Sequence, residues 1–223
     1  RAKNHGRLGS PNGCPRSTMS LESEKGGTNV AIELEQYDDS KHDRRTVARL
    51  IFDSDPVFNG LVYGDDAIGV IEAMLGLGDN YFDHTQCAVQ EGRVVGVIVG
   101  FPVSEKAHID QNSGKGFARA MGFLRFLARM PLFMRMDKMM PAVEDESGYY
   151  VHTISVDPEY RGRGIGTEII ERTAAAHGAL YLHVNRDNES AIRFYERNGF
   201  ERVEEGSMTH KGRELSQVLM RRT

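Results

Sequence analysis

The chain has 223 residues, of which 39% are hydrophobic and 27% charged, as in a globular protein and unlike a disordered one. Its formal net charge is -4, which argues against a nucleic-acid partner, because nucleic-acid-binding surfaces need dense Lys and Arg. The longest apolar run, residues 94–101, is far shorter than the roughly 20 residues of a membrane-spanning helix. We therefore expect a compact protein without a membrane span.

The N-terminal stretch differs from the rest of the chain. Residues 1–18 are rich in Gly, Pro, Asn and Ser, show no apolar period and carry basic groups but no acids. We interpret this stretch as a leader or linker, and residues 19–223 as a single folded domain. The two cysteines, Cys14 and Cys87, cannot form a disulfide framework, which favours a reducing, cytoplasmic setting. No His or Cys spacing typical of a metal site occurs, so no metal is expected.

The first half of this domain reads as strand, two helices and a hairpin. Residues 29–36 alternate apolar and polar side chains as a strand does, and residues 38–52 follow with helical spacing behind Asp and Ser. A second helix is predicted at residues 65–77. Residues 86–89 and 94–103 then form two β-rich runs around a polar turn, the second run buried on both faces.

Residues 104–143 stand apart, because they combine six methionines with Phe, Leu and Arg at helical spacing. We predict a helical insertion, broken at Pro131. Clustered Met suits irregular core packing as well as adaptable apolar surfaces. A helical hairpin over the sheet, a hydrophobic acceptor pocket and a dimer contact all remain open for it.

Strands and helices alternate in the last third. Strands are predicted at residues 149–156 and 179–184, each followed by a helix, and a final hairpin at residues 200–205 and 214–222. Together the elements predict an α/β fold whose mixed β-sheet carries helices on both faces. Cys87 falls on a strand among apolar neighbours, so we expect a buried structural thiol.

The segment DPEYRGRGIG at residues 157–166 joins a strand to a helix through a Gly-rich bend. Several backbone N–H groups and the positive end of the helix dipole then converge on one spot, which attracts phosphate. The Walker pattern is absent, because no Gly-Lys is followed by Ser or Thr. The dinucleotide pattern GxGxxG fails in both registers, at Thr167 and at Ile169.

Two spaced motifs carry a resemblance. Arg161, Gly164 and Gly166 make (Q/R)xxGxG, and Asn188, Ala191, Tyr195, Gly199 and Phe200 make NxxAxxxYxxxGF. In both, the chain resembles the GNAT superfamily of N-acetyltransferases. The resemblance is specific over residues 148–203, loose over residues 28–102 and absent from the leader and the insertion.

The resemblance implies a centrally splayed sheet that takes acetyl-CoA as cosubstrate. The pantetheine arm would pair with the main chain of Ile154 and Val156. Asn188, which is also expected to cap its helix, would hydrogen-bond the arm near Ala191. The pyrophosphate would lie on the amides of the bend, namely those of Arg161, Gly162, Arg163, Gly164, Ile165 and Gly166.

The resemblance also implies the catalytic groups. Tyr195 matches the general acid of the family. For the general base we favour His152, because strand alternation places it on the face of Tyr150, Ile154 and Val156, toward the opened sheet. An acidic residue (Glu144, Asp145 or Glu146) or water remains an alternative base.

The implied activity is acetyl transfer from acetyl-CoA to a primary amine, on a small molecule or a peptide, directly within a ternary complex. Two rival functions remain open. One is a non-catalytic acyl-CoA-binding module on the same fold, and the other is a binding module for another nucleotide. A homodimer is compatible with either.

Overall fold

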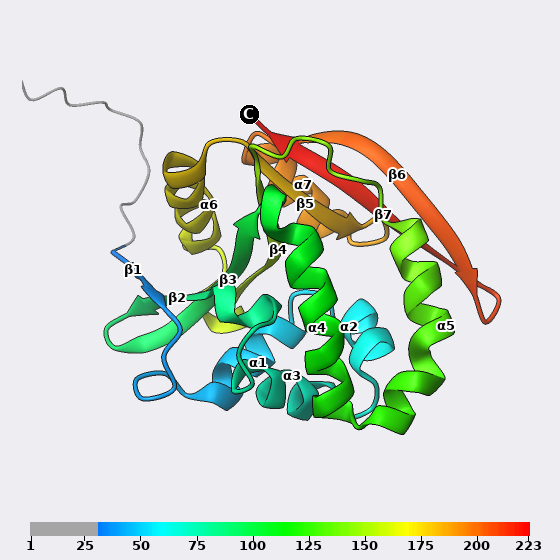
Figure 1. Cartoon of the computed structure of the whole chain (residues 1–223). Coiled ribbons are helices and arrows are strands. Elements are labelled where there is room, and N and C mark those ends of the chain that lie inside the picture. Colours follow the sequence, from blue (N-terminus) through cyan, green and yellow to red (C-terminus); the bar gives the residue numbers. More distant parts are fainter. Residues whose placement is uncertain (1–30) are drawn as a thin grey trace, which may run out of the picture.

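The computed structural model describes residues 31–223, so the leader predicted at residues 1–18 lies outside the described residues. Seven strands form one mixed sheet in the order β1-β2-β3-β4-β5-β7-β6 (Figure 1). Within it β4 and β5 pair in parallel, and the other neighbours pair antiparallel. The strands are β1 (Glu33–Gln36), β2 (Thr85–Gln90), β3 (Arg93–Pro102), β4 (Tyr149–Val156), β5 (Leu180–Asn185), β6 (Glu201–His210) and β7 (Arg213–Arg222).

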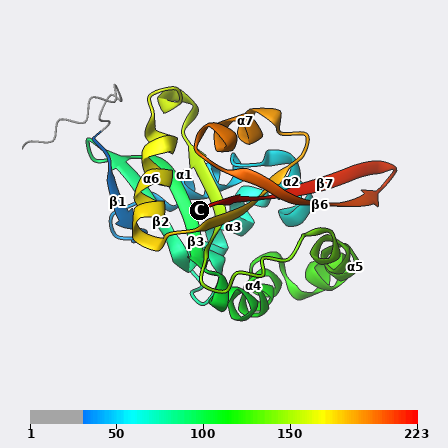
Figure 2. The same ribbon diagram turned by 90° about the horizontal axis from the view of Figure 1, so that it is seen from above.

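Helices cover both faces of the sheet, as predicted (Figure 2). On one face, the front, α1 (Arg44–Phe52), α2 (Pro56–Tyr63), α3 (Ala67–Leu75), α4 (Lys106–Met121) and α5 (Phe123–Met139) share a core with β2 and β3. On the back face, α6 (Ile165–His177) and α7 (Glu189–Arg197) pack on a second core. Short 3-10 turns are η1 (Tyr81–His84), η2 (Val103–Glu105) and η3 (Pro158–Tyr160).

Two sequence-based expectations about the helices are wrong. Helix α2 was not predicted, although Pro56 at its first turn and the Asp55 carboxylate, which accepts from the Phe58 N–H at 3.0 Å, are ordinary start signals. The insertion is helical, but Pro131 lies within α5 and does not break it. The break falls at Gly122, whose φ of 87° lies where only glycine is comfortable.

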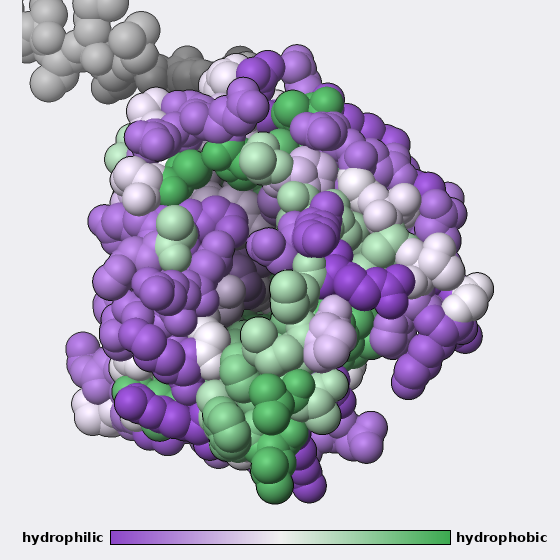
Figure 3. Space-filling model, turned by 45° about the vertical axis from the view of Figure 1, so that its right-hand side comes forward, coloured by the Kyte–Doolittle hydropathy of each residue, from purple (hydrophilic) through white to green (hydrophobic). Residues whose placement is uncertain are grey.

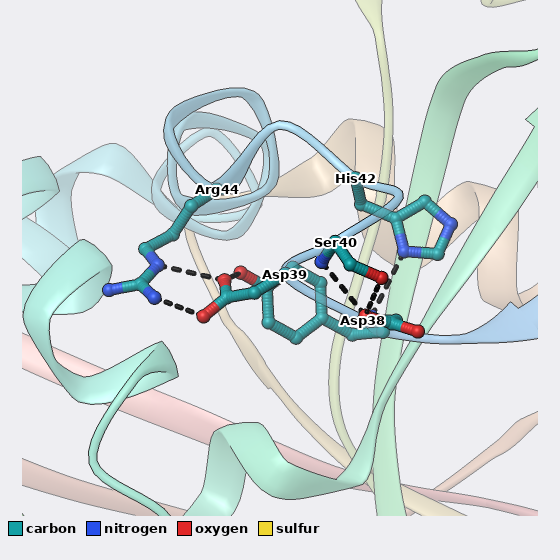
Figure 4. Close-up of polar contacts among 6 residues, drawn as sticks. Asp38, Asp39, Ser40, His42 and Arg44 are labelled. Atoms are coloured by element: carbon teal, nitrogen blue, oxygen red, sulfur yellow. Dashed lines mark hydrogen bonds and ion pairs between the residues drawn. The ribbon is translucent and has the colours of Figure 1, made fainter.

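The turn between β1 and α1 is held by short-range polar contacts (Figure 4). Asp38 accepts from the Ser40 N–H at 2.8 Å, and Arg44 pairs with Asp39. The Asp43 carboxylate caps α1 by accepting from the Thr46 N–H at 2.8 Å. These contacts fix the direction of α1. Its Arg49 then reaches Asp157, at the end of β4, with 3.4 Å between Nη2 and Oδ2.

The insertion is anchored at its C-terminal end on strand β6. Met136 and Met139 are buried there, and the Arg135 guanidinium donates to the Thr209 carbonyl. Gly206 makes this contact possible, because the position of a Cβ on Gly206 is taken by the Met139 carbonyl. Part of the methionine cluster therefore works as packing between α5 and the sheet. No helix of residues 31–223 is long and apolar enough to cross a membrane.

Candidate active site

The sheet opens between β4 and β5. The two strands pair at Tyr149–Leu180, Tyr150–Tyr181 and Val151–Leu182, although β4 continues to Val156 and β5 to Asn185. Beyond Val151 they separate, and the expected central splay is present. A separated strand leaves main-chain groups without ladder partners, which is costly unless water or a ligand satisfies them.

The free edge of β4 faces this opening. Asp157 donates its N–H to the Val95 carbonyl at 2.9 Å, so alternate residues direct their main-chain groups toward β3. Ile154 and Val156 direct theirs the other way, toward β5. The Val156 carbonyl already accepts from Arg161 Nε at 2.8 Å. Among the described residues, the Val156 N–H and both main-chain groups of Ile154 have no ladder partner on β5, so they remain for a ligand.

A cleft runs through the splay from one face of the sheet to the other. On the front it is lined by the start of α2 and the end of the insertion, and on the back by α7. Side chains of β4 and β5 form its walls. The lining includes Asp55, Asn59, Met140, Tyr150, His152, Ile154, His183, Asn185, Asn188, Ala191, Tyr195 and Gln217.

The Gly-rich bend adopts an open conformation at the start of α6. Gly162 and Gly164 have φ values of 75° and 84°, which side chains disfavour. Among the described residues, no acceptor pairs with the backbone N–H groups of residues 162–167. A Cβ on Gly166 would lie 2.9 Å from Phe194 Cζ, so glycine also permits contact between α6 and α7. The bend therefore has the properties of an anion-binding helix start.

A β-bulge places His152 differently from the sequence-based expectation. Val99 pairs with Thr153 and Gly100 pairs with Val151, so His152 is an extra residue in the ladder. The extra residue reverses the alternation: Ile154 and Val156 pack in the back core. His152 instead stacks on Tyr81 at the front, with 4.5 Å between ring centroids. The prediction that these side chains share one face is wrong, because a bulge shifts the strand period by one.

His152 is an uncharged imidazole in the cleft. Burial lowers its pKa to about 4, and the charge of nearby Asp110 opposes this shift only in part. Its Nδ1 lies 3.0 Å from Thr153 Oγ1, which orients the ring. Among the described residues, Nε2 has no hydrogen-bond partner. In the tautomer that donates Nδ1–H to Thr153 Oγ1, Nε2 carries a lone pair that points to no donor within residues 31–223 and can accept from a ligand, and the lowered pKa makes it a weak base.

His183, which sequence reasoning had not placed in the site, holds the opposite wall. Its Nε2 lies 2.9 Å from the Pro141 carbonyl, which can only accept, so Nε2 carries the proton. Its Nδ1 then accepts from the Tyr150 hydroxyl at 2.9 Å. Burial lowers the pKa of His183 to about 4. Because both ring nitrogens are hydrogen-bonded, His183 holds Tyr150 and the Pro141 carbonyl in place and is not free to act as a base.

Tyr195 enters the cleft from α7. Its ring packs against Phe194 and Phe200, with centroids 5.4 Å and 5.5 Å away. Burial raises the pKa of Tyr195, so its phenol stays protonated at neutral pH. Among the described residues, nothing hydrogen-bonds its hydroxyl. The group is thus a proton donor held in an apolar setting.

Asn188 caps α7, as predicted, with Oδ1 accepting from the Ala191 N–H at 3.1 Å and from the Ser190 hydroxyl at 2.9 Å. The cap uses only the oxygen of the amide. Nδ2 therefore remains available to a ligand in the cleft.

Asp55 is a second residue that sequence reasoning missed. It caps α2 and lines the cleft, and burial raises the pKa of its carboxyl. The Asp-Pro pair before an apolar run was the available signal for it. The acidic candidates of residues 144–146 do not line the cleft. Of these, Asp145 accepts from the Ser147 hydroxyl, the Tyr181 hydroxyl and the Ser147 N–H, which lower its pKa.

Two other sequence-based expectations concern groups away from the cleft. Cys87 is fully buried, and burial raises the pKa of its thiol to about 12, so it is a structural residue. Cys14 lies outside the described residues. Across residues 31–223, no cluster of three or more His, Cys, Asp or Glu side chains is arranged to hold a metal ion.

Residues 30–200 match the model of the Acetyltransferase (GNAT) family, and the chain belongs to this family. A 57-residue segment is 47% identical to N-alpha-acetyltransferase RimI of Mycobacterium tuberculosis, covering 25% of this chain and 36% of that protein. A 54-residue segment is 35% identical to peptidyl-lysine N-acetyltransferase YjaB of Escherichia coli, covering 24% of this chain and 37% of that protein. The matches thus span little more than a third of these relatives.

The fold agrees with the family over most of the chain. An N-acetyltransferase from Staphylococcus aureus Mu50 superposes with a TM-score of 0.58 at 20% identity, covering 84% of this chain and 99% of that one. At this identity the likeness shows the shared fold, including the mixed seven-stranded sheet.

Proposed function

We propose that the protein is an acetyl-CoA-dependent N-acetyltransferase that moves the acetyl group to a primary amine by direct transfer in a ternary complex. Two neighbouring observations carry the proposal. The first is the cleft through the splay, whose lining includes Ile154 and Tyr195, and the second is the run of amides at residues 162–167, just beyond the end of β4, that have no acceptor among the described residues. The names of the two relatives support an amine acceptor, on a peptide N-terminus or on a lysine. A small-molecule amine fits the cleft chemistry equally.

The residues at the bend fit the phosphates of coenzyme A. The amides of residues 162–167 would face an anion together with the positive end of α6, and the glycines would let it approach the backbone closely. The Arg161 N–H, which the resemblance had included, already donates to the Pro158 carbonyl at 3.4 Å. Arg163 stacks on Tyr160, 5.0 Å from the ring centroid, and keeps its charge near the bend. Arg161 has a second role, because its Nε donates a hydrogen bond to the Val156 carbonyl and so satisfies that acceptor.

The strand edge fits an extended amide-containing arm. The Val156 N–H and the main-chain groups of Ile154 would pair with it as a neighbouring strand would. Nδ2 of Asn188 offers one more donor, and the small side chain of Ala191 leaves room along α7. When bound, acetyl-CoA supplies the acetyl thioester.

Two side chains would handle the protons. His152 would accept the amine proton at Nε2, where it is neutral and lines the cleft. Tyr195 would donate its phenolic proton to the departing thiolate sulfur, since burial keeps the phenol protonated. The two groups come from β4 and α7, on opposite sides of the opening.

The front of the cleft suits a cationic acceptor. Asp55 is half-buried and lines the front of the cleft together with the polar side chains of Asn59, Asn185 and Gln217. Burial raises the pKa of the Asp55 carboxyl, and an ammonium group bound next to it would lower that pKa again and stabilise the ionised carboxylate. Asp55 would thereby select amines that carry a positive charge.

The test is an acetyl-transfer screen across small amines, lysine peptides and peptides with free N-termini, using the wild type, His152→Gln and Tyr195→Phe. Turnover that both substitutions reduce supports the proposal. Calorimetry with CoA, NAD and ATP accompanies the screen. CoA binding without turnover would favour the non-catalytic acyl-CoA-binding module, and preferential binding of NAD or ATP would favour the nucleotide module. Cytoplasmic location and a homodimer stay predictions.

A further inference from the structure

The start of α5 carries large apolar side chains that the protein leaves uncovered. Phe123 is 66% exposed, Leu124 80% and Leu127 54%, and these residues form what we call the α5 apolar patch. They follow Gly122, at the corner between α4 and α5, far from the anchored end of α5 on β6. Figure 3 shows apolar side chains gathered on this face of the molecule, below a hollow. Most apolar side chains elsewhere in the insertion are at least half-buried.

The patch is unlike the other large exposed apolar side chains of the described chain. Val57, Leu77, Met134 and Val203 are exposed singly, and scattered apolar residues are normal on protein surfaces. A contiguous group of one phenylalanine and two leucines at a helix corner is unusual on a protein surface. Such groups mark contacts with another protein or with a lipid surface.

The charge around the patch identifies the kind of partner. Residues 111–139 carry Lys115, Arg119, Arg125, Arg129, Arg135 and Lys138 against a single acid, Asp137, which is a balance of 6 - 1 = +5. The whole chain has a net charge of -4, so the other residues sum to -4 - 5 = -9. Arg135 lies at the anchored end of α5, and Arg129 donates to the Leu61 carbonyl. The exposed basic groups nearest to the patch along the chain are Lys115, Arg119 and Arg125, and residues 111–136 contain no acid to offset them.

We propose that the α5 apolar patch docks on the surface of an anionic lipid bilayer. Apolar side chains on a protruding helix enter the boundary between headgroups and acyl chains, while flanking Lys and Arg are attracted to anionic headgroups. The combination of Leu124 and Leu127 with exposed Arg125 between them fits this environment. A second copy of the chain fits it less well, because it would bring two segments of the same positive charge face to face.

The test is flotation of the full chain with vesicles. Vesicles made of equal parts phosphatidylglycerol and phosphatidylcholine are compared with vesicles of phosphatidylcholine alone. We expect binding to the anionic vesicles only, weakened by added salt, and reduced about tenfold or more by the double substitution Leu124→Ser and Leu127→Ser. Both side chains are exposed, so the double variant should fold.

The matched control is Val203→Ser, which removes a half-exposed apolar side chain from β6, in an acidic stretch away from the patch. It should bind anionic vesicles as the wild type does. Absence of wild-type binding, or equal binding by the double variant, would overturn the proposal. A self-association in ultracentrifugation that the double variant abolishes, without vesicle binding, would overturn it in favour of a second copy. Acetyl transfer is a separate readout, which the double variant should leave unchanged.

Discussion

The β4 edge and the α5 apolar patch are both unsatisfied surfaces of the protein. The β4 edge presents backbone polar groups without hydrogen-bond partners in the described chain, and the patch presents apolar side chains to solvent. Along the β5-facing edge of β4, at Ile154 and Val156, and along the bend, backbone N–H groups have no partners among residues 31–223. At the start of α5, apolar side chains lack cover. Unpaired amides call for a ligand with fixed hydrogen-bond geometry, whereas bare apolar side chains call for a non-directional surface. The first region should therefore respond to single-atom changes, and the second to lost apolar area and to salt.

The largest effect is expected at Tyr195. Tyr195→Phe keeps the ring that packs on Phe194 and Phe200 but removes the proton donor. We expect kcat for acetyl transfer to fall by about 10² to 10⁴, with CoA affinity by calorimetry within about twofold of wild type. An unchanged kcat would show that Tyr195 is only a packing residue. A large loss of affinity would show that it acts on binding.

The anchored end of the insertion provides a second test, this time on stability. Gly206→Ala would place a methyl group where the Met139 carbonyl lies, so α5 or β6 must shift. We expect a loss of about 3 kcal/mol in the free energy of unfolding, from urea titration. The control is Gly114→Ala on α4, where nothing lies within 4 Å of the new Cβ and alanine favours the helix. Equal stability of the two variants would contradict the observed contact.

Lowering the pH should reduce the free energy of unfolding, because two largely buried histidines line the cleft. Burial lowers the pKa of both His152 and His183 to about 4, below the usual 6.5, so the unfolded chain binds more protons between these values. Stability is therefore complete above about pH 6.5 and falls as the pH drops, by about 2 kcal/mol per imidazole from about pH 7 to about pH 5. Urea titrations across this range measure it. His152→Gln should flatten the dependence by about half, and an identical dependence in that variant would contradict its buried, neutral state.

The smallest predicted effect separates the two roles of Asn188. Asn188→Ala should cost about 1 kcal/mol of stability through the lost cap of α7. Asn188→Asp keeps the capping oxygen but replaces the amide donor, so it should restore stability while weakening CoA binding. If Asn188→Asp binds CoA as the wild type does, Nδ2 makes no contact with the ligand.

Sequence patterns predicted the succession of strands and most helices along the chain, because apolar periodicity and Gly or Asp at element ends are local signals. The splay was implied by the resemblance to the GNAT superfamily, and the open bend was predicted from the glycines around Gly164. The bulge at His152 could not be predicted, because it depends on the register between β3 and β4. The contact of Gly206 with Met139 likewise depends on how two distant segments pack. Both features depend on contacts between segments that are distant in the sequence, and such contacts produce no periodic pattern of apolar residues.

We propose that the amides of residues 162–167 and the edge of β4 hold coenzyme A. Titration of isotope-labelled protein with CoA, followed by backbone amide NMR, measures this contact at each residue. We expect saturable shifts concentrated at residues 161–167 and at Ile154 and Val156, with no change at the start of α5. If the shifts leave the bend and the β4 edge untouched, coenzyme A binds elsewhere.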